Sequence, residues 1–369
     1  SVLLLIACLA FLTVAMTSRF GLVGDLLFVG PTLVAIWAAG YFCFAGYNLW
    51  IPAASLSLTV VFSYLATTVY SGLTERRERR RITNIFGQYV DERVVKQLIE
   101  NPVMSRIGGE NREVTILFSD LKGFTKLSEH LGAEKIVKLM NIYLTEMTDI
   151  IRHNEGTIDK FIGDSIMAFW GAPLPNPEAP YLACLSALQM QTRLEEMQSR
   201  WSEFGDIEVK QRIGINTGVC IIGNVGSERK TNYTAIGDAV NLASRLEGVN
   251  KRYGTSILIS EFTFSKVAER FVLREIEPVV VQGKTEAVIV YELRARSDEG
   301  LGSNSRVFLN LYYQALASHK KGEDAVAANL FRKAMASDSE DPVCQYFLDK
   351  IDHLRVKDSS AGGKDAEQK

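Results

Sequence analysis

The chain has 369 residues, with 41 Lys and Arg against 43 Asp and Glu and a formal net charge of −2. This balance argues against a nucleic-acid-binding protein held by bulk positive charge, and the 47% hydrophobic content excludes a disordered chain. The length predicts two or three domains. Charge is unevenly distributed, because residues 1–70 contain only two charged side chains, Arg19 and Asp25. The sequence therefore predicts a membrane segment, residues 1–71, joined to a soluble part.

The membrane segment contains three apolar runs, residues 2–16, 27–46 and 50–70. As helices, the second and third runs would each be about 30 Å long, which matches the hydrocarbon core of a bilayer. We therefore expect about three transmembrane helices in a lipid bilayer. Five arginines within residues 75–81 follow the last run, and this positive charge places the rest of the chain in the cytoplasm. The prediction is a multi-pass anchor in the cell membrane, and a chain that begins with Ser is expected to lack an upstream part.

Helices are predicted on both sides of the central part of the chain. Residues 72–102 carry apolar side chains at intervals of three and four and end at Pro102, which indicates a helical connector. This connector forms either a coiled coil between two chains or a helix packed on its own domain. Residues 306–352 also indicate helices and resemble a tetratricopeptide unit, which we expect to pack on the central domain or on a second chain. Residues 353–369 are predicted to form a flexible tail.

The central part, residues 103–296, is expected to form an α+β domain. Apolar residues alternate over residues 113–120, which indicates a strand. The segment GTIDKFIGDSIMAFWG indicates two short strands around a turn at Gly163 and Asp164. Further strands alternate with long helices, which predicts a sheet with helices on one side.

Two carboxylates stand out by their positions. Asp120 follows the first strand, and Asp164 lies in the hairpin turn. If these strands pair, both carboxylates meet at one edge of the sheet, where oxygen ligands suit hard divalent cations. Two metal ions there would activate an attacking hydroxyl and neutralise a phosphate chain. The backbone amides of Gly123, Phe124 and Thr125 follow directly and would form an anion-binding turn. Each aspartate alone is more typical of an ordinary turn, so the prediction depends on the pair.

Three segments in this order, FSDLKGFT, KFIGDSIMAFWG and YTAIGDAVNLASRLE, resemble the catalytic segments of class III nucleotide cyclases. The resemblance covers about residues 85–295. It implies a ferredoxin-like catalytic domain that works as a head-to-tail homodimer, with each active site shared between two chains. A dimer of this chain would therefore have two sites.

The resemblance also implies roles for individual residues. Asp120 and Asp164, helped by the Leu121 carbonyl, would bind two Mg²⁺ or Mn²⁺ ions at each site. Asn241 would orient the ribose, and Arg245 would stabilise charge on the transferring α-phosphate. Asn241 and Arg245 are four residues apart on a predicted helix, hence on one face, which fits convergence on one ligand.

The base that is read can be argued from hydrogen bonding. Lys160 and Thr234 match the base-reading positions of the family. An ammonium donor suits N1 of adenine, an acceptor, and a hydroxyl can accept from the 6-amino group. Guanine would present its N1–H, a donor, to the donor of Lys160. The resemblance implies Glu and Cys at these two positions in guanylate cyclases. The implied substrate is ATP, and the Lys–Thr pair is similar to a subgroup that includes bicarbonate-responsive cyclases, so a bicarbonate response is a hypothesis.

The contacts to the triphosphate are less well defined. Arg229 or Lys230 would match an arginine that binds the β- and γ-phosphates in the family. Lys284, in VVVQGKTEA, resembles another phosphate-binding lysine, although Gln282 replaces a lysine that is common there. Solvated surface charge is the competing interpretation for all three cations.

The resemblance thus predicts a membrane-anchored adenylate cyclase of the bacterial type that makes cyclic AMP and pyrophosphate in signal transduction. Two alternatives remain: a guanylate cyclase, which Lys160 disfavours, and a membrane receptor whose cyclase domain only binds nucleotide. Membrane spans before a cyclase domain also suggest an extracytoplasmic sensor upstream.

Overall fold

A computed structural model describes residues 2–86, 108–205, 207–227, 230–280, 287–300, 302–337 and 341–362. The chain divides into two units, Ser1–Tyr89 and Val90–Lys369. Most of the predicted connector, together with the rest of residues 87–107, lies outside the described residues.

In its described part, the first unit consists of the helices α1 (Val2–Tyr47) and α2 (Ala53–Phe86), which pack against each other. Two segments of these helices are long and apolar enough to cross a membrane, Phe28–Tyr47 and Ala53–Thr74. The buried share is 0% in the first segment and 17% in the second. Most of the described apolar side chains of these two segments are therefore exposed, and Leu56 and Val60 of α2 are buried.

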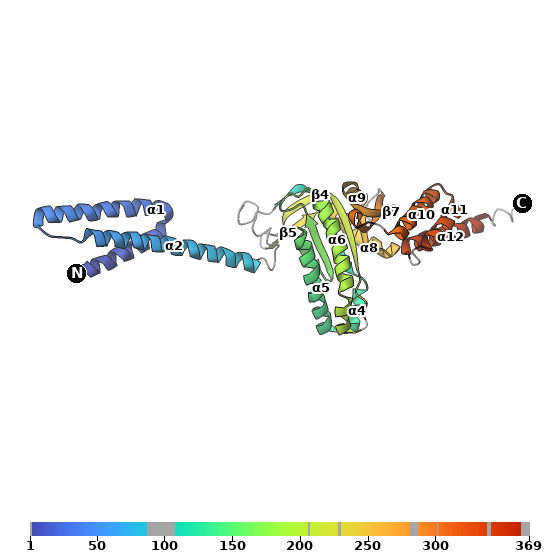
Figure 1. The fold of residues 1–369 in the computed structure, drawn as a ribbon, viewed down its shortest axis with the longest axis horizontal. Coiled ribbons are helices and arrows are strands. Elements are labelled where there is room, and N and C mark those ends of the chain that lie inside the picture. The colour runs from blue at the N-terminus through green and yellow to red at the C-terminus, as the bar shows by residue number, and fades with distance from the viewer. Residues whose placement is uncertain are drawn as a thin grey trace. The chain divides into compact units, whose positions relative to one another are not determined.

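The first two apolar runs lie in one helix and are not separated by a loop. α1 contains residues 2–16 and 27–46, and it bends partway along its length (Figure 1). The sequence between the runs contains Gly21 and Gly24 and no proline, and such glycines allow a helix to bend without the loss of a backbone donor. The number of membrane crossings stays a prediction. α2 continues through residues 72–86, the first part of the predicted connector.

The second unit is built on an eight-stranded mixed sheet. Its strands are β1 (Gly108–Leu121), β2 (Thr157–Ile162), β3 (Ser165–Trp170), β4 (Gln211–Ser227), β5 (Lys230–Ile236), β6 (Ile257–Ser260), β7 (Phe271–Val279) and β8 (Val288–Arg296). They follow the order β2-β3-β1-β4-β6-β8-β7, and β5 forms a hairpin with the second half of β4. Among these pairs, β4 and β6 run parallel and the others antiparallel.

Helices cover both faces of this sheet. They are α4 (Phe124–Leu131), α5 (Ala133–His153), α6 (Ala179–Glu196), α7 (Gln198–Trp201), α8 (Asp238–Tyr253) and α9 (Glu261–Val267). α5 and α6 lie side by side on one face (Figure 1), where they share a core with Leu117 of β1. Ile116 points to the other face and shares a core with Ala243 of α8. The expectation of helices on one side only is therefore wrong, because adjacent residues of the central strand are both apolar and each face needs a cover.

Three C-terminal helices complete the second unit: α10 (Ser303–Lys320), α11 (Asp324–Met335) and α12 (Pro342–Gly362). Their buried side chains form one core with residues of α8, β6, β7 and β8. They therefore pack on the central domain, while the likeness to a tetratricopeptide unit stays a prediction. α12 extends into the segment expected to be a tail, since no glycine or proline interrupts it before Gly362.

Candidate active site

Asp120 and Asp164 come together at one edge of the sheet. Asp120 is the next-to-last residue of β1, and Asp164 lies in the turn between β2 and β3. β1 pairs antiparallel with β3, with Ser119 opposite Ile166, so the end of one strand meets the start of the other. The Leu121 amide donates to Oδ2 of Asp164 at 3.2 Å, and the Ser165 hydroxyl donates to Oδ1 of Asp120 at 2.8 Å. Strand pairing thus creates the expected carboxylate pair.

The electrostatics of this pair suit a hard cation. Burial and the neighbouring charge of Asp120 raise the pKa of Asp164 to about 6. A divalent cation between the carboxylates would relieve this repulsion, and carboxylate and carbonyl oxygens are the ligands it prefers. The described residues contain no cluster of three acidic, His or Cys side chains that could hold a metal. Further ligands would therefore come from the Leu121 carbonyl, from substrate phosphates or from water.

A guanidinium that the sequence interpretation missed lies against the carboxylate pair. Arg212 stands opposite Asp120 in the pairing of β4 with β1, and its Nη2 is 2.9 Å from Oδ2 of Asp120. Its Nε donates to Oε1 of Glu247 on α8 at 3.0 Å. Burial, and then the charge of Asp120, raise the pKa of Glu247 to about 7. In the sequence, Arg212 is only a basic residue at the start of an apolar strand. The strand register is needed to place it beside Asp120.

Lys160 and Thr234 also meet within one chain. Nζ of Lys160 on β2 donates to the Thr234 hydroxyl on β5 at 3.1 Å. A third residue, Asp159, joins them: the Thr234 hydroxyl donates to its Oδ2 at 2.6 Å, and its Oδ1 lies 3.1 Å from Lys160. β2 has a register shift between Ile158 and Lys160, and such a bulge lets consecutive side chains act on one side of a strand. Sequence reasoning missed Asp159 because alternation assigns neighbouring residues to opposite faces.

Asn241 and Arg245 lie one turn apart on α8, as expected from their spacing. Asn241 is exposed, whereas Nη1 of Arg245 is buried and has no hydrogen-bond partner. A buried guanidinium donor without a partner is costly, so it is suited to a ligand oxygen. Within the described part of the chain, neither side chain makes a hydrogen bond or ion pair with Asp120 or Asp164. The structure therefore leaves this pair apart from the carboxylate pair of the same chain.

The predicted phosphate contacts are only partly described. Gly123 has a φ of +76° and precedes α4, so the amides of Gly123, Phe124 and Thr125 lie at a helix N-terminus just after Asp120. Unpaired amides at such an end favour anions. Lys230 is the exposed first residue of β5. The other two predicted phosphate ligands, Arg229 and Lys284, lie outside the described residues.

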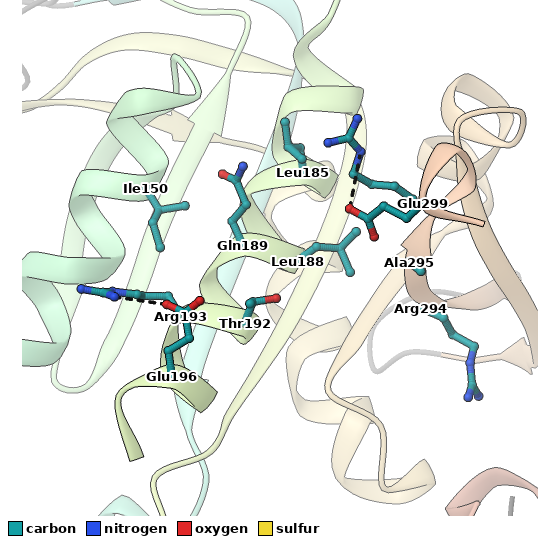
Figure 2. A pocket seen from close by; sticks show the side chains of 11 residues that line it. Ile150, Leu185, Leu188, Gln189, Thr192, Arg193, Glu196, Arg294, Ala295 and Glu299 are labelled. Atoms are coloured by element: carbon teal, nitrogen blue, oxygen red, sulfur yellow. Dashed lines mark hydrogen bonds and ion pairs between the residues drawn. The ribbon is translucent and has the colours of Figure 1, made fainter. Parts of the chain in front are cut away.

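A cavity of about 450 Å³ lies between α5, α6 and the end of β8 (Figure 2). It is lined by Ile150 and Leu188 and by several charged side chains. Two of its arginines pair with neighbouring acids, Arg193 with Glu196 at 3.2 Å and Arg296 with Glu299 at 3.9 Å. None of the predicted site residues lines this cavity, so it is separate from the carboxylate pair.

Comparison with known proteins agrees with the motifs. Residues 109–295 match the family model described as the adenylate and guanylate cyclase catalytic domain. The chain is 35% identical over 208 residues to adenylate cyclase 1 of Rhizobium meliloti (strain 1021), covering 56% of this chain and 31% of the relative. It is 37% identical over 209 residues to an adenylate cyclase of Anabaena cylindrica, covering 55% and 40%. The chain thus spans less than half the length of these relatives.

A solved structure supports the fold of the second unit. A bacterial light-regulated adenylyl cyclase aligns with a TM-score of 0.51 at 25% identity, covering 63% of this chain and 65% of that one. The mixed sheet and its helices are therefore an arrangement that occurs in a known cyclase.

Proposed function

This chain belongs to the family of adenylate and guanylate cyclase catalytic domains, and from that premise we propose that it is a membrane-anchored adenylate cyclase. The reaction converts ATP to 3′,5′-cyclic AMP and pyrophosphate. The 3′-oxygen forms a bond to the α-phosphorus, the bond from that phosphorus to the oxygen that bridges to the β-phosphorus breaks, and the hydroxyl proton passes to solvent water.

The observation that supports ATP over GTP is the cluster of Asp159, Lys160 and Thr234. The Thr234 hydroxyl donates a hydrogen bond to Asp159 and accepts one from Lys160, so its second lone pair can accept from a ligand. Lys160 donates to Thr234 and forms an ion pair with Asp159, so at least one of its three ammonium donors remains for a ligand. One donor beside one acceptor matches N1 and the 6-amino group of adenine. Guanine presents the opposite pattern, and a mismatch of buried hydrogen bonds discriminates strongly.

The carboxylate pair supports a metal-dependent reaction. Asp120, Asp164 and the Leu121 carbonyl would hold Mg²⁺ or Mn²⁺, with two ions at each site. When bound, such ions supply charge neutralisation and a more acidic hydroxyl. Arg212 lies beside Asp120 and would bind the phosphate oxygens that approach it. The unpartnered Nη1 of Arg245 would stabilise negative charge on the reacting phosphate.

We infer a homodimer with shared sites. Asn241 and Arg245 do not reach Asp120 and Asp164 within the described part of one chain, and a second copy would bring the two pairs together. Several apolar side chains near the hairpin of β4 and β5 and on β2 are between 46% and 62% exposed, a surface suited to burial against another copy. They are Phe161, Ile162, Val219, Ile221 and Ile236.

The membrane anchor is supported by the two long apolar segments with largely exposed side chains. The arginines of residues 75–81 would then face the cytoplasm together with the catalytic domain. A sensor on the other side of the bilayer would complete a signalling protein. A chain that the bilayer does not retain would contradict this part of the proposal.

The test is product formation by the full chain, purified in detergent, with ATP or GTP and with Mg²⁺ or Mn²⁺. We expect cyclic AMP from ATP, with loss of product in Asp164→Ala at unchanged thermal stability. Cyclic GMP as the main product would overturn the argument from Lys160 and Thr234 and favour a guanylate cyclase. Nucleotide binding without product from either substrate would favour a receptor that does not catalyse.

A further inference from the structure

The C-terminal end of α8 lies directly against the start of α12. Gly254 ends α8 with a φ of +70°, and a Cβ at this position would lie 2.6 Å from Cβ of Pro342. The rings of Tyr253 and Tyr346 meet edge to face, with 4.8 Å between their centroids and an interplanar angle of 81°. The two helices are therefore in close contact, although they are far apart in the sequence.

Glu277 of β7 joins these two helices through hydrogen bonds. Its Oε1 accepts from the hydroxyls of Tyr253 and Tyr346, each at 2.7 Å, and Lys350 pairs with its Oε2. The Tyr346 oxygen also accepts from Nη2 of Arg252 at 2.8 Å. Burial opposes ionisation of Glu277, but Lys350 and the two hydroxyls hold its pKa below the ordinary value. An ionised acceptor thus binds α12 and the last turn of α8 at one point of the sheet.

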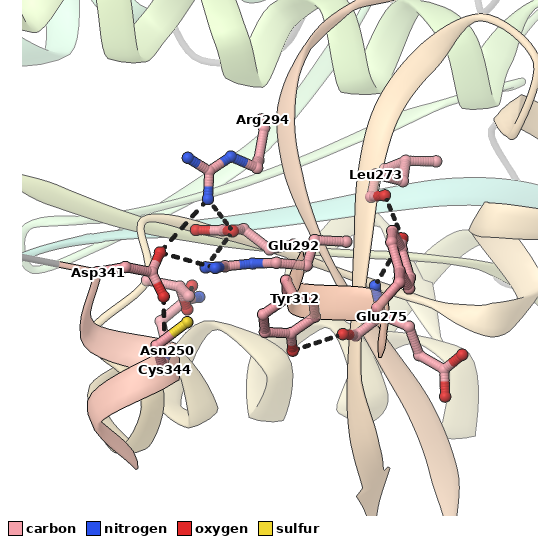
Figure 3. Close-up of polar contacts among 11 residues, drawn as sticks. Asn250, Leu273, Glu275, Glu292, Arg294, Tyr312, Asp341 and Cys344 are labelled. Atoms are coloured by element: carbon pink, nitrogen blue, oxygen red, sulfur yellow. Dashed lines mark hydrogen bonds and ion pairs between the residues drawn. The ribbon is translucent and has the colours of Figure 1, made fainter. Parts of the chain in front are cut away.

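A buried ionic cluster fixes the start of α12 to the sheet (Figure 3). Arg274 of β7 is fully buried, and its Nη1 donates to Oδ2 of Asp341 at 2.7 Å. Its Nη2 lies 2.6 Å from Glu292 of β8, and its guanidinium lies 4.9 Å from the ring centre of Tyr312 on α10. Oδ1 of Asp341 accepts from the amide of Cys344 at the start of α12. α12 therefore has a defined position relative to β7, and it can hold α8 in turn.

α8, which α12 and β7 hold in this way, carries Asn241 and Arg245, the residues proposed to bind the substrate. Arg252 lies seven residues after Arg245, about 10 Å along the helix axis. From these contacts we propose, resting on the proposed function, that Tyr346 and Glu277 are positioning residues for catalysis. They fix the C-terminal end of α8, and the helix carries this constraint to Asn241 and Arg245. The C-terminal helices are on this view part of the catalytic apparatus.

The test compares two tyrosines that each lose only a hydroxyl. Tyr346→Phe removes the bonds to Glu277 and Arg252 and keeps the ring. Tyr313→Phe is the matched control, because its hydroxyl joins α10 to β7 through Leu273 and does not reach α8. Both variants are made in the full chain. The measurements are kcat and KM for ATP, the thermal midpoint, and hydrogen exchange of amides in residues 241–254.

We expect Tyr346→Phe to lower kcat about five-fold, the usual effect of one hydrogen bond, with KM changed less than about two-fold. Amides of α8 should exchange faster in Tyr346→Phe and not in Tyr313→Phe, while both variants keep similar thermal midpoints. Equal effects of the two variants on kcat, or faster exchange without a fall in kcat, would overturn the inference. If the unmodified chain makes no cyclic nucleotide, the proposed function fails. The exchange comparison then decides whether α12 holds α8, and equal exchange in both variants rejects it.

Discussion

Asp159→Asn is expected to weaken the preference for ATP over GTP. In the structure the Asp159 side chain is fully buried and accepts the proton of the Thr234 hydroxyl, which leaves Thr234 as an acceptor for the base. Oδ2 of Asp159 also accepts from the Ala235 amide at 3.2 Å, so an asparagine keeps its carbonyl oxygen at this position and turns its amide donor toward Lys160. Lys160 then loses its anionic partner and meets a second donor. This displaces the ammonium group from the position assigned to N1 of adenine.

The size of this effect follows from the kind of bond that is lost. A hydrogen bond from a charged donor such as Lys160 contributes about 1.5–3 kcal/mol, which corresponds to a loss of about 10- to 150-fold in kcat/KM for ATP. kcat/KM for GTP should change little, because N1–H of guanine is a donor and makes no hydrogen bond with Lys160. Lys160 is 39% exposed, so water can solvate its charge and the variant should keep most of its stability.

The assay is competition between ATP and GTP, with both cyclic products separated by chromatography. Asp149→Asn is the control, since Asp149 lies exposed on α5 and its replacement should leave the product ratio unchanged. An unchanged ratio in Asp159→Asn, with activity for both nucleotides intact, would refute the role assigned to this cluster. A lower thermal midpoint with an unchanged ratio would make Asp159 purely structural.

Further predictions concern the metal site, the phosphate contact and the buried ionic cluster. The raised pKa of Asp164, about 6, predicts that Mn²⁺ binding strengthens as the pH rises through 6, because the cation needs the ionised carboxylate. A Mn²⁺ affinity that calorimetry finds independent of pH would contradict this. In the metal-free protein the same carboxyl stabilises the fold when protonated, so its contribution is lost as the pH rises from about 4 to about 6. Arg212→Ala should lower kcat/KM for ATP about 100-fold. Glu247→Gln should lower kcat/KM less, because Glu247 only orients Arg212. Equal and small losses in steady-state kinetics would argue against a phosphate contact. Arg274→Ala leaves Glu292 and Asp341 with only Arg294, which lies 3.4 Å from each, and should cost about 3 kcal/mol of stability by denaturant titration. The exposed Arg332→Ala should change the stability little.

The carboxylate pair could be predicted from the sequence because it depends on short-range rules. A strand that ends at Asp120 and a hairpin with Asp164 at its turn can be recognised from alternation and turn residues alone. Antiparallel pairing then brings the two together. Asn241 and Arg245 were similarly accessible, since helical periodicity places them on one face.

Asp159 and Arg212 could not be predicted in the same way. Asp159 acts beside Lys160 because of an irregularity in β2, and no composition rule marks where a strand bulges. Arg212 is 92 residues from Asp120, and only the register of β1 with β4 shows that they meet. The contact between α8 and α12 likewise depends on tertiary packing of residues far apart in the chain.

The central claim is that cyclic AMP forms at a site shared by two copies of this chain. Asp164 and Arg245 of one site would come from different copies of the chain. A homodimer of either Asp164→Ala or Arg245→Ala therefore has no intact site and should be inactive. Co-expressed in equal amounts, they should regain about a quarter of the unmodified activity, because half of the dimers are mixed and each mixed dimer has one intact site. A mixture as inactive as either variant, with mixed dimers demonstrated by two affinity tags, would contradict the shared site.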